Sequence, residues 1–426
     1  MRRFGQGWPR VLRWFSITAV AAALVAVSAC AHGSGERRPA AVPLPPDYAA
    51  MLAQVAAERG LAPPSTLRIG TVPRDSLPAV LDAASTGDDA RLTRLSTIYR
   101  LLGLLPEGVD YAAASRSGLD AAVGAFYVPG KREVWLVRDG PLPGSPAELE
   151  PWEQRLLAHE FVHALQDYHF DIPALERAAG TTDARLALRA LLEGDATWTE
   201  SRWTARVLMP RLRPGALVDP PPAAAPPPPA LAREASFQYV TGAEWVALLR
   251  RDDAGAVDRL LRDGVPLATA LVLHPDLPRT DWTPSGVAIP PGVPAEGWQA
   301  NDSDSLGEFL IASYLQSALP ALPSLQAASG WTADAVRLYR TPGGQAAMAW
   351  RIRFSDAKEA GEFAARHRDL LERRADRLTA GAGMLTAVRR DSVTVVQLEA
   401  QGNEVTLVFA GQSDAAETLA RYLLNR

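Results

Sequence analysis

The 426-residue sequence predicts an α+β protein in two parts: a mainly helical part over residues 47–325 and a smaller α+β part over residues 326–426. Helical periodicity dominates the first part and is interrupted by a short β-rich hairpin. From about Gly330, strand-like runs and amphipathic helices are mixed instead. Hydrophobic residues make up 47% and charged residues 22%, as in ordinary globular proteins. The formal net charge of −4 gives no electrostatic case for nucleic-acid binding.

Residues 1–29 have the layout of a secretory signal peptide. A basic start with four arginines precedes the uncharged apolar run from Trp14 to Ala29, which is short for a membrane span. Val27-Ser28-Ala29-Cys30 resembles a bacterial lipobox, which predicts lipidation at Cys30; the alternative is an ordinary cysteine beside a cleavage site. We therefore expect a lipid-anchored protein on the extracytoplasmic side of the cell envelope, with a proline-rich tether over residues 30–46.

Short elements precede the central motif of the chain. Helical periodicity predicts helices over residues 47–59 and 91–104, and residues 67–72 are typical of a short strand. Two further β-rich runs, Ala125–Val128 and Glu133–Val137, predict a hairpin just before the motif. This hairpin either presents an edge strand to an extended substrate or simply completes a sheet.

His159-Glu160-Phe161-Val162-His163 is the most informative motif. A helix is expected from Pro151, and two histidines four residues apart project from the same face of a helix. Such a pair binds zinc, and the intervening glutamate is placed to act as general base on a water. Because Cys30 is the only cysteine, no thiolate ligand is available after lipidation, and the remaining ligand must be a carboxylate or a histidine.

Glu193 is the best candidate for the third ligand. A helix predicted over residues 183–209 can return antiparallel to the motif helix, and Leu191-Leu192 indicates that this section is buried. Gly194 costs about 1 kcal/mol relative to alanine in a helix interior. Close approach of the two helices at the metal would explain its presence.

Two other residues compete with Glu193. His169 stands where a metzincin has its third histidine, but Gln166 replaces the glycine that such a motif requires. Glu200 lies on the same face as Glu193 but about 10 Å further along the helix, so the two glutamates are not expected to share one ion.

The rest of the chain is also predicted to be mainly helical before about Gly330 and to mix strands and helices after it. The proline-rich segment 219–230 predicts an extended surface loop. In the last part, Ser355 is expected to cap a long helix that ends at about Arg377. The other predicted helices cover residues 237–251, 256–262, 305–317 and a final segment from Ser413, and the predicted strands cover residues 336–339, 347–354 and a hairpin over 393–408.

The sequence His159–Asp167 followed by Glu193-Gly194-Asp195-Ala196 resembles the gluzincin-type zinc metallopeptidases, in particular a group of uncharacterised prokaryotic surface lipoproteins. The likeness covers about residues 60–370, loosely outside the helices. It includes the segments Gly103–Pro106, Gly124–Tyr127, Val272–Pro275, Leu306–Phe309 and Gly330-Trp331.

This resemblance implies a zincin-like fold for residues 47–325, with Zn²⁺ bound by His159, His163 and Glu193 and with Glu160 as the catalytic base. Better-known gluzincins carry an aspartate four residues after the ligand glutamate, where it supports a histidine ligand. This chain has Thr197 there. Asp167 and Asp195 are the candidates for the missing acceptor.

The first hypothesis is therefore a membrane-anchored metallopeptidase that acts on peptide or protein substrates. It also needs a donor for the oxyanion, and Tyr239, Tyr127 and His274 are candidates, although each could equally be a structural residue. The second hypothesis is a non-catalytic envelope lipoprotein with a structural zinc and a partner-binding C-terminal domain. The third is an accidental motif in a protein that binds no zinc.

Overall fold

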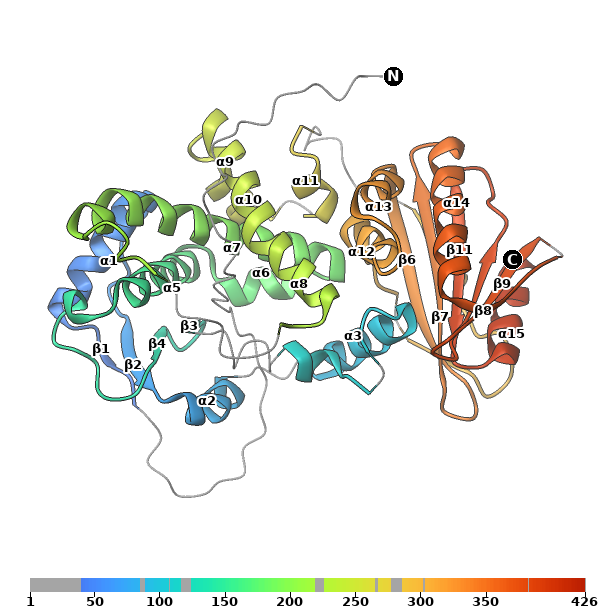
Figure 1. Ribbon diagram of the computed structural model, residues 1–426, viewed down its shortest axis with the longest axis horizontal. Coiled ribbons are helices and arrows are strands. Elements are labelled where there is room, and N and C mark those ends of the chain that lie inside the picture. Colours follow the sequence, from blue (N-terminus) through green and yellow to red (C-terminus); the bar gives the residue numbers. More distant parts are fainter. Residues whose placement is uncertain are drawn as a thin grey trace.

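The computed structural model describes residues 40–84, 89–106, 108–115, 124–218, 226–264, 267–276, 286–301, 303–381 and 383–425. The predicted signal peptide, Cys30 and most of the tether lie outside the described residues, as does much of the predicted proline-rich loop. The described chain mixes helices and sheets, which confirms the α+β class (Figure 1). Within it, no helix is both long enough and apolar enough to cross a membrane.

The first part contains a small sheet of four strands in the order β1-β2-β4-β3. The predicted hairpin is confirmed, because β3 and β4 pair antiparallel and β3 forms an edge of the sheet. Strand β1 pairs with β2, so the end of the predicted tether belongs to the folded part. The strands are β1 (Val42–Pro43), β2 (Arg68–Val72), β3 (Ala125–Val128) and β4 (Glu133–Val137).

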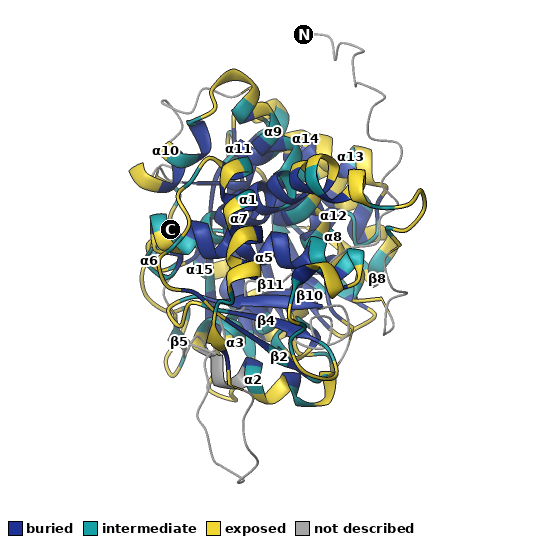
Figure 2. Ribbon diagram, turned by 90° about the vertical axis from the view of Figure 1, so that its left-hand side faces the viewer, coloured by how far each residue is buried: buried dark blue, intermediate teal, exposed yellow. Residues whose placement is uncertain are grey.

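Three helices, α1 (Pro46–Arg59), α5 (Pro151–Phe170) and α7 (Thr182–Trp203), pack together beside this sheet. Helix α5 starts with proline at its first position, and the Glu153 carboxylate accepts a hydrogen bond from the Glu150 backbone amide. In Figure 2, which colours residues by burial, most of the visible part of α5 is dark blue. Helix α7 ends six residues earlier than predicted, where the chain continues as a π-helical segment over Thr204–Leu208.

Further helices surround α7. Helix α8 runs through the π-helical segment Phe237–Thr241, which we call η6, into α9 (Gly242–Asp252). A Cβ on Gly194 of α7 would lie 2.3 Å from the backbone carbon of Gly242. The close approach that Gly194 permits is thus to α9, not to the motif helix as predicted. The remaining helices of this part are α2 (Leu77–Ala84), α3 (Asp89–Leu102), α6 (Ile172–Ala178), α8 (Pro229–Ser236), α10 (Ala256–Asp263) and α11 (Thr269–Leu273).

The C-terminal part is built on a seven-stranded sheet in the order β5-β6-β7-β11-β10-β9-β8, in which all neighbours are antiparallel. Helices α14 and α15 cover its two faces (Figure 1). Its strands are β5 (Gln299–Ala300), β6 (Trp331–Arg340), β7 (Ala346–Phe354), β8 (Ala375–Gly381), β9 (Met384–Arg389), β10 (Thr394–Leu398) and β11 (Glu404–Ala410), and its helices are α12 (Gly307–Leu315), α13 (Ala321–Ala328), α14 (Ala357–Arg374) and α15 (Ser413–Leu424).

Two sequence predictions for this part need correction. The long helix is capped by Asp356, not Ser355, and it ends at Arg374 because residues from Ala375 onward form the unpredicted strands β8 and β9. The sheet also starts earlier than residue 326, since β5 pairs with β6. One hydrophobic cluster joins α3, α7 and α12 to this sheet, so the two predicted parts share a core.

Candidate metal centre

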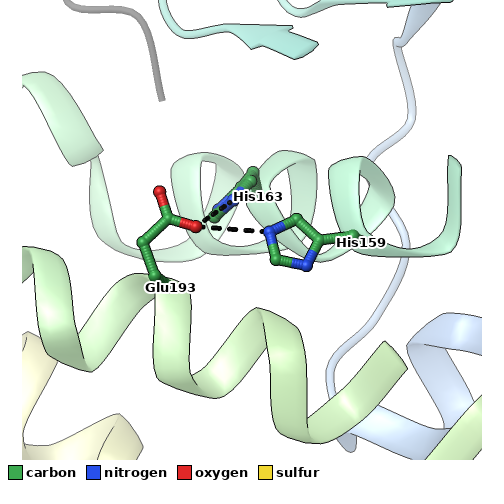
Figure 3. Close-up of side chains that lie close together, drawn as sticks. All are labelled: His159, His163 and Glu193. Atoms are coloured by element: carbon green, nitrogen blue, oxygen red, sulfur yellow. Dashed lines mark hydrogen bonds and ion pairs between the residues drawn. The ribbon is translucent and has the colours of Figure 1, made fainter. Parts of the chain in front are cut away.

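Helices α5 and α7 bring His159, His163 and Glu193 together, as the sequence predicted (Figure 3). One ligand atom from each lies within 4.8 Å of the others. The histidines are one helical turn apart on α5, and Glu193 faces them from α7. All three are at most 3% exposed, and polar side chains buried this deeply normally need partners.

The distances within this group suit a tetrahedral metal ion. The Nε2 atoms of His159 and His163 lie 3.2 and 3.4 Å from the same Glu193 oxygen, Oε2. A tetrahedral zinc with bonds near 2.0–2.1 Å separates neighbouring ligand atoms by about 3.3 Å. The two distances from the histidine nitrogens to the Glu193 oxygen therefore match the edge of such a site.

Gln166 fixes the orientation of His163. The Gln166 amide nitrogen lies 3.0 Å from both the Leu192 carbonyl and Asp195 Oδ2, which can only accept hydrogen bonds. Its oxygen Oε1 must then point to His163 Nδ1, 2.9 Å away, and Nδ1 must donate. In a neutral imidazole, the other nitrogen, Nε2, carries a lone pair.

That lone pair has an unusual neighbour. His163 Nε2 is buried and has no hydrogen-bond partner among the described residues, and it faces the Glu193 carboxylate. When His163 is neutral, its Nε2 and the Glu193 oxygen are two acceptors that face each other in a buried site, and they repel unless a cation lies between them. The arrangement therefore fits a shared cation, with nitrogen and oxygen donors of the kind that zinc accepts.

Asp195 holds Gln166 in place from behind. It also forms ion pairs with Arg59 Nε at 2.6 Å and with Arg250 Nη2 at 2.8 Å. Although burial alone would raise the pKa of Asp195, these two guanidiniums lower it below its usual range. The candidate acceptor Asp195 thus reaches the centre through Gln166, whose role the sequence did not reveal.

Asp167, the other candidate acceptor, is used elsewhere. Its Oδ2 accepts a 2.7 Å hydrogen bond from the Tyr127 hydroxyl, and its Oδ1 accepts one from the Ile172 backbone amide. Asp167 therefore ties α5 to the edge strand β3 and to the start of α6. No hydrogen bond links it to His159 or His163 within the described chain.

Glu200 approaches the outer side of His159. Its Oε2 lies 3.4 Å from His159 Nδ1, within ion-pair distance but outside hydrogen-bond geometry. Burial alone would lower the pKa of His159, but contacts with Glu193 and Glu200 raise it to about 10. The sequence did not predict this contact between Glu200 and His159, which resembles the carboxylate partners common around metal-binding histidines.

Glu160 is wholly buried next to His159. Neither carboxylate oxygen has a hydrogen-bond partner among the described residues. Burial raises the pKa of Glu160 to about 7, against the opposing effect of His163 and His159. A carboxyl with this pKa can both accept and release a proton near neutral pH.

The remaining predicted site residues lie in different surroundings. The Tyr239 ring lies 6.0 Å from the His159 ring, and burial together with Glu193 and Glu160 raises the pKa of its hydroxyl well above its usual value. His274 instead pairs with Glu308 at 2.8 Å. His169, the weaker ligand candidate, contacts the Ala62 carbonyl through Nε2 at 2.7 Å and does not belong to the metal group.

Comparison with known proteins bears only on the C-terminal part. Residues 295–420 match the family model of a Domain of unknown function (DUF8575). This match starts at the segment that contains β5 and does not include the histidine and glutamate group. No curated protein and no solved structure matches the chain.

Proposed function

We propose that His159, His163 and Glu193 bind a zinc ion and that the protein is a membrane-anchored extracytoplasmic metallopeptidase. The observation that carries the metal assignment is the buried His163 Nε2 atom, which lies 3.4 Å from a Glu193 oxygen and has no hydrogen-bond partner among the described residues. A set of two histidines and one carboxylate leaves one zinc position for water or substrate, which is typical of catalytic sites.

Zinc bound there would supply Lewis acidity to a water and to a substrate carbonyl. Glu160 then acts as general base: it accepts the proton of the attacking water and passes it to the leaving amine. Its lack of hydrogen-bond partners leaves both carboxylate oxygens free for this task. The His163–Gln166 bond and the Glu200 contact keep the two imidazoles oriented.

Tyr239 is the best of the three candidate oxyanion donors. Burial and the negative charges of Glu193 and Glu160 raise the pKa of its hydroxyl, so the hydroxyl stays protonated and can donate a hydrogen bond. The Tyr127 hydroxyl already donates to Asp167, and His274 is paired with Glu308. Tyr239 belongs to η6, a π-helical segment of the kind often found at functional sites.

The near-complete burial of the centre favours a second candidate function. His159, Glu160 and His163 are at most 1% exposed, so a peptide could reach them only after local opening. A structural zinc that joins α5 to α7 in a partner-binding envelope lipoprotein needs no such access. A structural zinc would, however, give no role to the buried Glu160 carboxylate.

Metal analysis and a peptide-library assay on the full chain separate these candidates. For the peptidase, wild type contains one zinc and cleaves peptides, and Glu160→Gln keeps the zinc but loses cleavage. Glu372→Gln, a change at an exposed position of α14, is the control and should behave as wild type. Zinc without cleavage in wild type favours the structural role, and an absence of bound zinc refutes both.

The proposed anchor is tested separately. Cys30→Ser should release the protein from membranes, because it removes the proposed site of acylation. Unchanged membrane association of this variant would contradict lipidation at Cys30.

A further inference from the structure

A cavity of about 1000 Å³ lies away from the metal centre, between the two parts of the molecule. Its walls come from most of the length of α3, the start of α8, the residues just after α12 and the hairpin that joins β6 to β7. In Figure 1, α3 lies between the helical part and the large sheet. The volume is at the upper end of the range for small-molecule sites.

The charge of this cavity is strongly one-sided. Five arginines line it, namely Arg94, Arg100, Arg233, Arg340 and Arg374, and Asp391 is the only carboxylate that the described residues contribute to its lining. The chain as a whole has a formal net charge of −4, so this excess of positive charge is local. A recess lined by charges of one sign concentrates ions of the opposite sign.

The single carboxylate does not neutralise these arginines. Asp391 is mainly engaged by Arg389, whose Nε lies 2.9 Å from Oδ1, and it is 3.9 Å from Arg374. Arg233 donates to Ser313 Oγ and to the Ser313 carbonyl, which are neutral acceptors. Elsewhere buried arginines meet acids directly, as Arg59 does with Asp195 and Asp258.

A structural role explains part of the cluster. Arg374 donates to the carbonyls of Leu102 and Gly103, where positive charge stabilises the C-terminal end of α3. This role does not extend to Arg94 and Arg100. Neither has an ion pair or side-chain hydrogen bond with the described residues, yet both lie along the cavity wall on α3. Burial also lowers the pKa of Arg233 and Arg374, and Asp391 offsets this effect only in part for Arg374.

We propose that this cavity is a binding site for a compact anion that carries two or more negative charges on phosphate or carboxylate groups. Guanidinium groups bind both kinds of group with paired hydrogen bonds. Neutral polar side chains in the same lining, including Gln299, Asn301 and Gln345, can bind uncharged parts of the ligand. The site is independent of the proposed zinc, because it shares none of the metal-group residues.

Isothermal titration of the full chain with inorganic pyrophosphate and with citrate tests the proposal. The cavity variant is the double change Arg94→Gln and Arg100→Gln. The control is Arg177→Gln with Arg368→Gln, two exposed helix arginines outside the cavity that remove the same total charge. Thermal unfolding of all three proteins checks that they remain folded.

Wild type and control should bind at least one probe saturably with a stoichiometry of one, and the cavity variant should bind it about tenfold more weakly or worse. Preference for pyrophosphate would identify a phosphate ligand, and preference for citrate a carboxylate ligand. The proposal is overturned if neither probe binds saturably, or if the cavity and control variants lose affinity equally or not at all.

Discussion

Replacement of Gln166 by methionine should weaken zinc binding while leaving all three proposed ligands in place. The change keeps the side-chain length but removes the 2.9 Å hydrogen bond to His163 Nδ1 and the two 3.0 Å bonds to Leu192 and Asp195. Loss of such a partner of a metal-bound histidine typically costs 10–100-fold in affinity, or about 1.4–2.7 kcal/mol. We therefore expect zinc affinity, measured by chelator competition, to fall by about this factor.

The same substitution should also destabilise the metal-free protein. His163 Nδ1 loses its partner, at about 1–3 kcal/mol for the unsatisfied group, whereas the Leu192 carbonyl keeps its hydrogen bond within α7. Asp195 keeps its two arginines, so the network does not collapse completely.

Gln154→Met is the matched control for Gln166→Met. Gln154 lies on the same helix, and its amide donates to the Leu149 carbonyl, away from the metal group. Equal zinc affinities for the wild type and the two variants would refute the claim that Gln166 orients a metal ligand.

Three further outcomes follow from the structure. Gly194→Ala should lower the free energy of unfolding in urea by about 1–3 kcal/mol, because the new Cβ meets Gly242 backbone atoms. Gly361→Ala is the control: its Cβ meets open space, so it should raise the free energy of unfolding by up to about 1 kcal/mol. A stable Gly194 variant would contradict the close α7–α9 packing. Burial lowers the pKa of His367 to about 4, below about 6.5 in the unfolded chain. The contribution of His367 to stability should therefore be present above about pH 6.5 and fall by about 2 kcal/mol at pH 5. Wild type should lose stability relative to His367→Gln by about this amount over that range, and parallel profiles for the two proteins would refute the prediction. Removal of metal by a chelator should lower the thermal unfolding midpoint, since zinc at about 1,000 times its dissociation constant adds about 4 kcal/mol. Glu193→Ala should abolish that chelator effect, and a shift that persists would point to a different metal site.

The parts of the fold with clear periodicity could be predicted from the sequence. The motif helix, the hairpin before it and the final helix lie close to the predicted positions. Strand β8 was missed because its residues are mostly exposed and include charged side chains that continue the pattern of α14. Strand β9 did carry a signal, since Met384–Arg389 alternates between partly exposed and buried positions.

The candidate site likewise has one part that the sequence predicts and another that depends on how the helices pack. The spacing of His159 and His163 is local information, and the buried leucines beside Glu193 indicated that its helix section faces the interior. The sequence placed Glu200 on the same helix face as Glu193, and Gln166 three residues after His163. Their contacts with the histidines, however, depend on the angle between α5 and α7. Sequence periodicity does not determine that angle.

The contact between the two parts suggests why the C-terminal part matters to the centre. Asp304, within the segment matched by the family model, accepts hydrogen bonds from the backbone and side chain of Thr182 at the start of α7. The Asp183 backbone amide donates to the Ser305 carbonyl. These contacts and the shared core fix the N-terminal end of α7, the helix that also carries Glu193. The position of the third proposed ligand against the two histidines thus depends in part on packing between both parts.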